Sequence, residues 1–168
     1  MEPQIIERGE LILAGMTFYG DPFASGEGWS SENAIGKLWG RFNALWDRAR
    51  DQITGMVNPD VAYEVHIEPP EYEETQQFYV TVGVEVDRVS SSPLELAYRV
   101  LPATTYAVFT LVGDEIRSDW PKTIYKEWLP QSEYEEAFKF TIERYGPGFK
   151  GMDDPTSELE VMVPVRHK

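Results

Sequence analysis

Two stretches of the chain resemble each other, and this internal repeat constrains the fold. Residues 10–21 read Glu-Leu-Ile-Leu-Ala-Gly-Met-Thr-Phe-Tyr-Gly-Asp, and residues 103–114 read Ala-Thr-Thr-Tyr-Ala-Val-Phe-Thr-Leu-Val-Gly-Asp. Each stretch is followed by a helical pattern rich in Trp and Leu and then by two runs typical of strands. The sequence therefore predicts two β-α-β-β halves that close around a shared crevice, and crevices of this kind bind small molecules.

Length and composition predict a single domain. The chain has 168 residues, 42% of them hydrophobic, with eight Phe, nine Tyr and five Trp. That is enough apolar surface for one sizeable core. We expect repeat one over about residues 1–88 and repeat two over about residues 96–168. The linker-like stretch 88–93 between them is too short to separate independent domains.

The charge balance narrows the classes of partner. The formal net charge of −14 repels phosphate backbones and anionic headgroups, so we expect neither a nucleic acid nor a membrane as partner. An acidic field favours cationic ligands, although it also serves solubility. The chain has no cysteine, and it shows no secretion signal and no apolar run of membrane-spanning length. These features favour a cytoplasmic protein.

The apolar pattern predicts one strand, one helix and two further strands in each half. In the first half these are a strand at residues 5–19, a helix that follows residue 31 and runs through residues 38–49, and strands at residues 61–67 and 78–86. In the second half they lie at residues 98–112, 116–129, 137–145 and 159–165. We expect a loop over residues 22–31, with Ser31 as the cap of the first helix. Pro121 suits only the first turn of the second helix, and Pro130 is expected to end it.

The functional prediction depends on the face of the strand 137–145 that Glu143 occupies. Side chains alternate along a strand, so Phe138, Phe140 and Ile142 share one face. Glu143 and Tyr145 share the other. We expect the apolar face to pack on the helices and Glu143 to point to the opposite face, where the two halves meet.

The same alternation in the strand 61–67 leaves Glu64, His66 and Glu68 on the crevice side. Aligning the two strands by their apolar faces predicts that His66 lies opposite Glu143. Tyr79 and Met162 each alternate with a Val-rich set that faces the helices, so we expect these two residues on the crevice side as well.

Two interpretations of Glu143 stay open. It is either a solvated sheet residue, paired with Arg144 or a lysine, or a carboxylate set among aromatic side chains. In the second case it would balance a bound cation or, with its pKa raised by desolvation, act as a base or nucleophile. Tyr106, Trp120 and Tyr145 can likewise be core residues or walls of a ligand site.

Several short motifs, in their order and spacing, resemble the GyrI-like superfamily, the effector-binding domain of AraC- and BmrR-type regulators. They read Thr-Tyr-Ala-Val-Phe-Thr-Leu-Val-Gly at 105–113, Trp-Leu-Pro at 128–130, Glu-Tyr at 133–134, Ile-Glu-Arg-Tyr at 142–145 and Leu-Glu-Val-Met-Val-Pro-Val at 159–165. The resemblance spans nearly the whole chain. It implies an α+β fold in which two β-α-β-β repeats, related by a pseudo-twofold axis, form an antiparallel sheet with a central aromatic groove.

The resemblance also implies a function. Drug-sensing members meet lipophilic cations with a buried glutamate, which by motif position is Glu143, and Tyr79 and Trp120 fall near positions that supply aromatic walls. The leading hypothesis is a stand-alone protein that captures lipophilic, cationic organic compounds. The alternative is a hydrolase of cyclopropane-bearing electrophiles, in which Glu143 is the base or nucleophile and Tyr145 or Tyr106 a proton donor. A third hypothesis is an interaction protein that inhibits DNA gyrase.

The candidate residues follow from these arguments together. The ligand-binding candidates are Glu143, Tyr79, Trp120, Tyr106, Tyr145, His66 and Met162, and the catalytic candidates of the hydrolase alternative are Glu143 and Tyr145. His66 and His167 are too few and too far apart for a zinc site, so we expect no metal and no cofactor. Both repeats are needed for the crevice, so we expect no DNA-binding domain. An exposed edge strand could support a homodimer.

Overall fold

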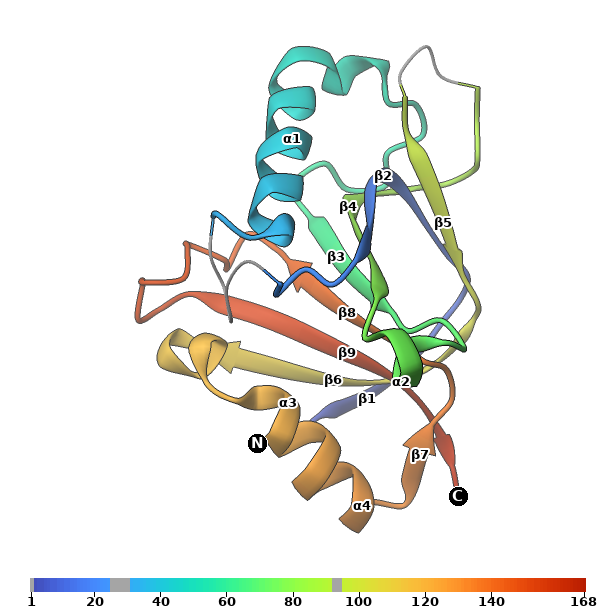
Figure 1. Ribbon diagram of the computed structural model, residues 1–168, viewed down its shortest axis with the longest axis vertical. Coiled ribbons are helices and arrows are strands. Elements are labelled where there is room, and N and C mark those ends of the chain that lie inside the picture. Colours follow the sequence, from blue (N-terminus) through green and yellow to red (C-terminus); the bar gives the residue numbers. More distant parts are fainter. Residues whose placement is uncertain (1, 25–30, 92–94) are drawn as a thin grey trace.

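The computed structural model describes residues 2–24, 31–91 and 95–168, and its strands form one nine-stranded sheet (Figure 1). The strands are β1 (Gln4–Arg8), β2 (Leu11–Gly20), β3 (Ala62–Ile67), β4 (Phe78–Val86), β5 (Ala97–Leu101), β6 (Thr104–Val112), β7 (Tyr134–Glu136), β8 (Phe140–Tyr145) and β9 (Glu158–His167). The order across the sheet is β1-β6-β9-β8-β3-β4-β2-β5, with β7 paired to β9, and every pairing is antiparallel. The predicted α+β fold with an antiparallel sheet is confirmed.

The strand order is symmetric about the central pair β3 and β8. Moving outward from that pair, β8 is followed by β9 and β6, and β3 is followed by β4 and β2. The corresponding strands of the two halves therefore occupy corresponding places, as the internal repeat predicts. The two halves are joined edge to edge by β3 and β8, whose paired residues run from Ala62 opposite Tyr145 to Ile67 opposite Phe140.

Two predicted strands are each divided in two. The stretch 5–19 breaks at Gly9 and Glu10, between β1 and β2, and the stretch 98–112 breaks at Pro102 and Ala103, between β5 and β6. The separated pieces have different partners, because β1 pairs with β6 while β2 pairs with β4 and β5. Apolar residues continue on both sides of each break, so the pattern alone predicts one long strand.

The helix of the first half is regular. Helix α1 (Ala34–Ala49) begins after Asn33, two residues later than predicted, because the Asn33 side chain accepts a hydrogen bond from Gly36 N at 2.9 Å. Its apolar stripe, which includes Leu38 and Phe42, packs on the Val-rich face of β4. Residues 25–30 of the predicted loop and residues 92–94 at the predicted linker lie outside the described residues.

The helical part of the second half is composed of short segments. In chain order they are the 3-10 turn η2 (Gly113–Arg117), α3 (Trp120–Lys122), the π-helical segment η3 (Thr123–Trp128) and α4 (Leu129–Gln131). Pro121 lies in the first turn, as predicted, and Asp119 caps it. Pro130 lies inside α4, which ends one residue later, so the predicted stop is wrong by one residue.

Smaller differences concern the loops and strand ends. The connection between β3 and β4 contains a one-turn helix, α2 (Tyr72–Thr75), and a 3-10 turn, η1 (Arg50–Gln52), follows α1. The predicted strand 137–145 begins only at Phe140, and the separate strand β7 precedes it.

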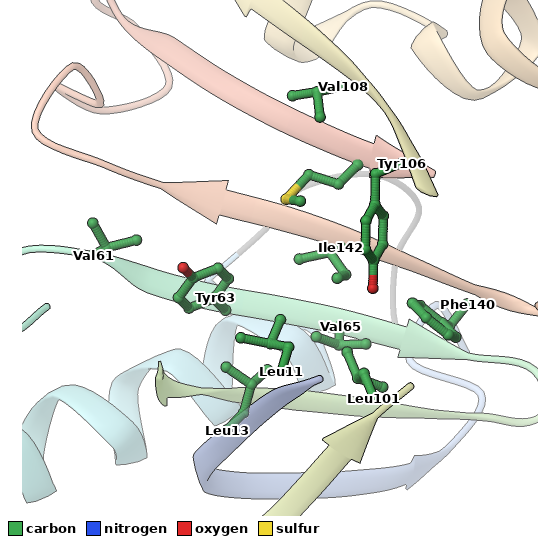
Figure 2. Close-up of a cluster of buried hydrophobic side chains, with 11 residues drawn as sticks. Leu11, Leu13, Val61, Tyr63, Val65, Leu101, Tyr106, Val108, Phe140 and Ile142 are labelled. Atoms are coloured by element: carbon green, nitrogen blue, oxygen red, sulfur yellow. The ribbon is translucent and has the colours of Figure 1, made fainter. Parts of the chain in front are cut away.

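The predicted relation between the helices and the crevice is wrong. Val65 and Ile142, which we expected to face the helices, lie in a cluster with side chains of β2, β5 and β6 (Figure 2). The helical segments pack on the opposite face, α1 against the valines of β4 and the second-half segments against Val161 and Val163 of β9. Because Val161 is the strand partner of Glu143, the helices and Glu143 share one face. The other face is covered by distant parts of the same curved sheet.

Candidate functional site

A cavity of about 1280 Å³ opens on the helix-bearing face. Its floor is made by β3 and β8, through Glu64, His66, Thr141, Glu143 and Tyr145. One wall comes from the second-half helical segments, with Trp120, Tyr125 and Leu129, and the other from Ile35 of α1 together with Tyr72 and Phe78. The cavity is somewhat larger than the usual site for a drug-sized ligand, about 300–1,000 Å³.

Two carboxylates face each other at the centre of the floor. Glu64 of β3 and Glu143 of β8 are directly paired in the register of the two strands, so the predicted register, with His66 opposite Glu143, is wrong. His66 lies instead opposite Thr141. Glu64 is only 4% exposed. The pairing brings together two like charges at the joint between the two halves.

Each of these carboxylates is held by an aromatic hydrogen-bond donor. Trp39 Nε1 of α1 donates to Glu64 Oε2 at 2.5 Å, and the Tyr145 hydroxyl donates to Glu143 Oε2 at 2.6 Å. The two donors also contact each other, with ring centroids 5.0 Å apart at 73°. His66 Nε2 lies 2.5 Å from the second oxygen of Glu64, Oε1. The floor therefore has two hydrogen-bonded sets, Trp39 and His66 on Glu64 and Tyr145 on Glu143, which meet at the rings of Trp39 and Tyr145.

Burial and mutual charge shift the titration of this group. Burial, followed by repulsion from Glu64, raises the pKa of Glu143 to about 7, although His66 and the Tyr145 hydrogen bond act in the other direction. Burial by itself would lower the pKa of His66, but its hydrogen bond to Glu64 and the charges of Glu64 and Glu143 raise it overall. Burial and the same two carboxylates hold the pKa of Tyr145 well above its usual value. Glu143 therefore changes charge near neutral pH.

The floor also has the ligand types of a metal site. One ligand atom each from Glu64, His66 and Glu143 can be chosen so that all lie within 4.8 Å of one another, the only such group of three among the residues that the structure describes. Imidazole and carboxylate are ligands that zinc accepts. Three protein ligands beside an open cavity could leave a position for a further ligand. The expectation of no metal stays a prediction.

Two of the four lysine and arginine side chains on the cavity lining have acidic partners away from the floor. Arg117 Nη1 lies 2.6 Å from Asp153 Oδ1, and Lys139 Nζ lies 2.5 Å from Glu136 Oε2. His66 is the only basic side chain that contacts Glu64 among the described residues. When Glu143 is ionised, the floor therefore carries more negative than positive charge.

Comparison with known proteins identifies the family. The family model described as the GyrI-like small molecule binding domain matches residues 1–166. The chain belongs to the GyrI-like family. The resemblance inferred from the sequence is thereby confirmed.

Similar proteins share the GyrI-like fold. SAV2435, solved bound to tetraphenylphosphonium, has a TM-score of 0.68 and 15% identity, over 99% of this chain and 94% of that one. The C-terminal domain of EcmrR has a TM-score of 0.65 and 17% identity, over 99% of this chain and 98% of that one. The transcriptional regulator BrlR of Pseudomonas aeruginosa is 29% identical over 167 residues, which are 98% of this chain and 56% of BrlR. The chain thus spans about half the length of this curated relative.

Four of the candidate residues line the cavity of this GyrI-like domain. They are Glu143, Tyr145, His66 and Trp120. The first three come from the central strands, and Trp120 begins α3 on the facing wall. Their proximity follows from the edge-to-edge joining of the two halves and from the position of the second helical segment above the joint.

The other three candidates lie outside the cavity. Tyr106 and Met162 belong to the cluster on the opposite face, where burial raises the pKa of Tyr106 to about 12 (Figure 2). The Tyr106 hydroxyl is buried and has no hydrogen-bond partner among the described residues. Tyr79 is on that face too, next to Tyr19 at 4.5 Å between ring centroids. The sequence predicts Tyr79 and Met162 on the crevice side because it predicts the crevice on the face without helices, and of the two interpretations of Tyr106 the structure supports the core residue.

Three residues of the site were not among the candidates. Glu64 was on the predicted crevice face, but only the actual register shows that it meets Glu143. Trp39 belongs to the apolar pattern of α1, which hides the role of its indole N–H. Tyr125, which hydrogen-bonds Thr141, lies in the π-helical segment, whose longer turn no α-helical pattern predicts.

No helix among the described residues is long and apolar enough to cross a membrane.

Proposed function

We propose that this GyrI-like domain captures lipophilic organic cations in the cavity above β3 and β8, with Glu143 as the principal charge partner. The observation that carries the proposal is a pair of carboxylates, Glu64 and Glu143, at the floor of a large cavity with aromatic walls. The tetraphenylphosphonium bound to SAV2435 supports it, because that ligand is a lipophilic cation.

The energetics favour a cation with a flat apolar body. A cation over the face of an aromatic ring gains about 0.5–2 kcal/mol per contact, and Trp120, Tyr125 and Tyr72 are available on the walls. Burying the ligand's charge costs free energy, which the charge of Glu143 offsets. A bound cation would also relieve the repulsion between Glu64 and Glu143. Aromatic walls with a charged floor discriminate weakly, so we expect several lipophilic cations to bind.

The test is the affinity for tetraphenylphosphonium, measured by isothermal titration calorimetry. We expect Glu143→Gln to weaken binding about tenfold or more, because the ligand then loses an ionised partner in a buried site. Glu158→Gln is the matched control, since it removes the same charge from an exposed position of β9 that does not line the cavity. Equal affinities for wild type and Glu143→Gln would refute the proposal.

A second candidate function uses the contact between Glu143 and Tyr145. A carboxyl group with a pKa of about 7 and a tyrosine hydroxyl at 2.6 Å form a pair suited to proton transfer. In a hydrolase, Glu143 would take a proton from water while the water oxygen bonds to a strained ring carbon. The ring bond would break, and its electrons would pass to a conjugated carbonyl oxygen that Tyr145 protonates.

Mass spectrometry separates the two functions. A cyclopropane-bearing electrophile that gains one water with wild type, but not with Glu143→Gln, would establish the hydrolase. Recovery of the unchanged compound together with tetraphenylphosphonium binding would leave a binding domain alone.

A further inference from the structure

We infer that the floor of the cavity selects cations that donate hydrogen bonds, namely protonated amines, amidines and guanidines, over cations without N–H groups. This inference rests on the proposed function and adds a ligand class to it. Glu64 is the residue that carries it, because a second carboxylate opposite Glu143 makes the floor more than a single negative charge.

The two carboxylates of the floor keep lone pairs that a ligand can use. An ionised carboxylate offers about four acceptor positions. In the described part of the chain, the Glu143 carboxylate accepts one side-chain hydrogen bond, from Tyr145, at Oε2. Glu64 has two side-chain partners, Trp39 at Oε2 and His66 at Oε1. Trp39 and Tyr145 thus hold one oxygen of each group, and acceptor capacity remains for a ligand, above all on Glu143.

The two glutamates are also directly paired across β3 and β8. Like charges at directly opposed positions of neighbouring strands destabilise the sheet. A group that carries positive charge and several N–H donors can reach both carboxylates at once and complete their hydrogen bonds. An ammonium offers three donors and a guanidinium five. A phosphonium or quaternary ammonium supplies the charge but leaves the acceptors unpaired in a buried site.

A third observation concerns the other basic side chains of the cavity lining. Arg117 and Lys139 are occupied by Asp153 and Glu136, away from the floor. Lys122 and Lys126 also line the cavity, and neither forms an ion pair with Glu64 or Glu143 in the described part of the chain. Among the described residues, only His66 therefore brings positive charge to the two glutamates. A second, bridging cation would come from the ligand.

The test compares two probes that differ only in the groups on nitrogen, three hydrogens in protonated 1-naphthylmethylamine and three methyl groups in its N,N,N-trimethylammonium counterpart. Both carry one positive charge on the same ring system. Calorimetry with the full chain, in the presence of EDTA, should show a preference for the primary amine of about tenfold, the effect of pairing one or two buried acceptors. Glu64→Gln should reduce that preference to about twofold, while the trimethylammonium probe still binds.

Two further variants keep the test decisive. Glu158→Gln removes a carboxylate from an exposed position of β9 that does not line the cavity, and should leave the preference unchanged. If Glu64→Gln fails to fold, Glu64→Asp keeps the charge with a shorter reach and should still lower the preference.

The outcomes separate this inference from the proposed function. Equal binding of the two probes to wild type, or an unchanged preference in Glu64→Gln, would overturn the inference while leaving cation capture intact. A preference that appears only without EDTA would assign Glu64, His66 and Glu143 to a metal ion, and would also overturn it. If neither probe nor tetraphenylphosphonium binds, the proposed function itself fails.

Discussion

On one face of the central strands, Val65 and Ile142 are fully buried among side chains from β2, β5 and β6; on the other, Glu64 and Glu143 line an open cavity. The same two six-residue strands serve both faces. The difference arises outside them, because the curved sheet covers one face while the two helical segments leave a gap over the other. The contrast shows that a strand at the joint between two repeats can support a dry core and a charged site at once.

The two helical segments beside the gap differ in a related way. Helix α1 buries five of its residues and forms a regular wall. The second-half segments bury Ile124 on their π-helical part and leave Trp120 and Tyr125 partly exposed toward the cavity. The regular helix supports the sheet, and the irregular one supplies two aromatic residues, Trp120 and Tyr125, to the cavity lining.

The largest expected effect is on stability and concerns the fully buried face of the central strands, which carries Val65 and Ile142. Ile142→Ala should lower the free energy of unfolding by about 2–5 kcal/mol, because it leaves a cavity among fully buried neighbours. Urea denaturation measures the change, with Thr110→Ala at an exposed position of β6 as control, expected within about 0.5 kcal/mol of wild type. A loss as small as that of the control would mean that this face is not the core.

The next effect concerns the charged face and depends on pH. The pKa of Glu143 is raised to about 7 in the folded protein, above its ordinary 4.5, so its contribution to stability is present below pH 4.5 and is lost as the pH rises through 7. Glu143→Gln should therefore be more stable than wild type above pH 7, on the order of 2 kcal/mol. Below pH 4.5 the difference should vanish.

Denaturation curves of wild type and Glu143→Gln, recorded below pH 4.5 and above pH 7, test this prediction. If wild type were the more stable of the two above pH 7, burial and repulsion from Glu64 would not disfavour the charged form of Glu143. Glu158→Gln, which removes an exposed carboxylate, should show no comparable gain.

A smaller effect is expected at the aromatic wall. Trp120→Ala should weaken tetraphenylphosphonium binding by about 0.5–2 kcal/mol, equivalent to about 2- to 30-fold, because one cation–aromatic contact is lost. Trp128→Leu is the control in the same helical region. The ring centroids of Trp128 and Phe109 lie 5.1 Å apart, and Trp128 does not line the cavity. Equal losses from both variants would indicate a general effect of the helical segment.

The smallest effect is expected for Tyr79, on the face away from the cavity. Tyr79→Leu should leave the affinity for tetraphenylphosphonium within about twofold of wild type, less than 0.5 kcal/mol. Calorimetry on the two proteins provides the comparison. A loss as large as that of Trp120→Ala would show that the ligand reaches the opposite face, and the contrast between the faces would fail.

Much of the fold could be predicted from local patterns. The strand 78–86 coincides with β4, and the apolar steps from Leu38 to Ala49 fall inside α1, because alternation and helical periodicity are properties of neighbouring residues. The breaks at Gly9 and Pro102 were missed, since the apolar pattern continues across them. The π-helical segment was missed because nothing in its residues distinguishes it from an α-helix.

Local patterns in the sequence are sufficient to predict the repeat, the resemblance to the family, the α+β class and the common face of Glu143 and Tyr145. They do not predict that this face carries the helices, that Glu64 rather than His66 lies opposite Glu143, or that Tyr79, Tyr106 and Met162 lie elsewhere, which follow from the folded chain. The cause is the difference between interactions of neighbouring residues and interactions of distant segments. Side-chain alternation is a local property of a strand, whereas covering a face and setting a register depend on segments far apart in the chain.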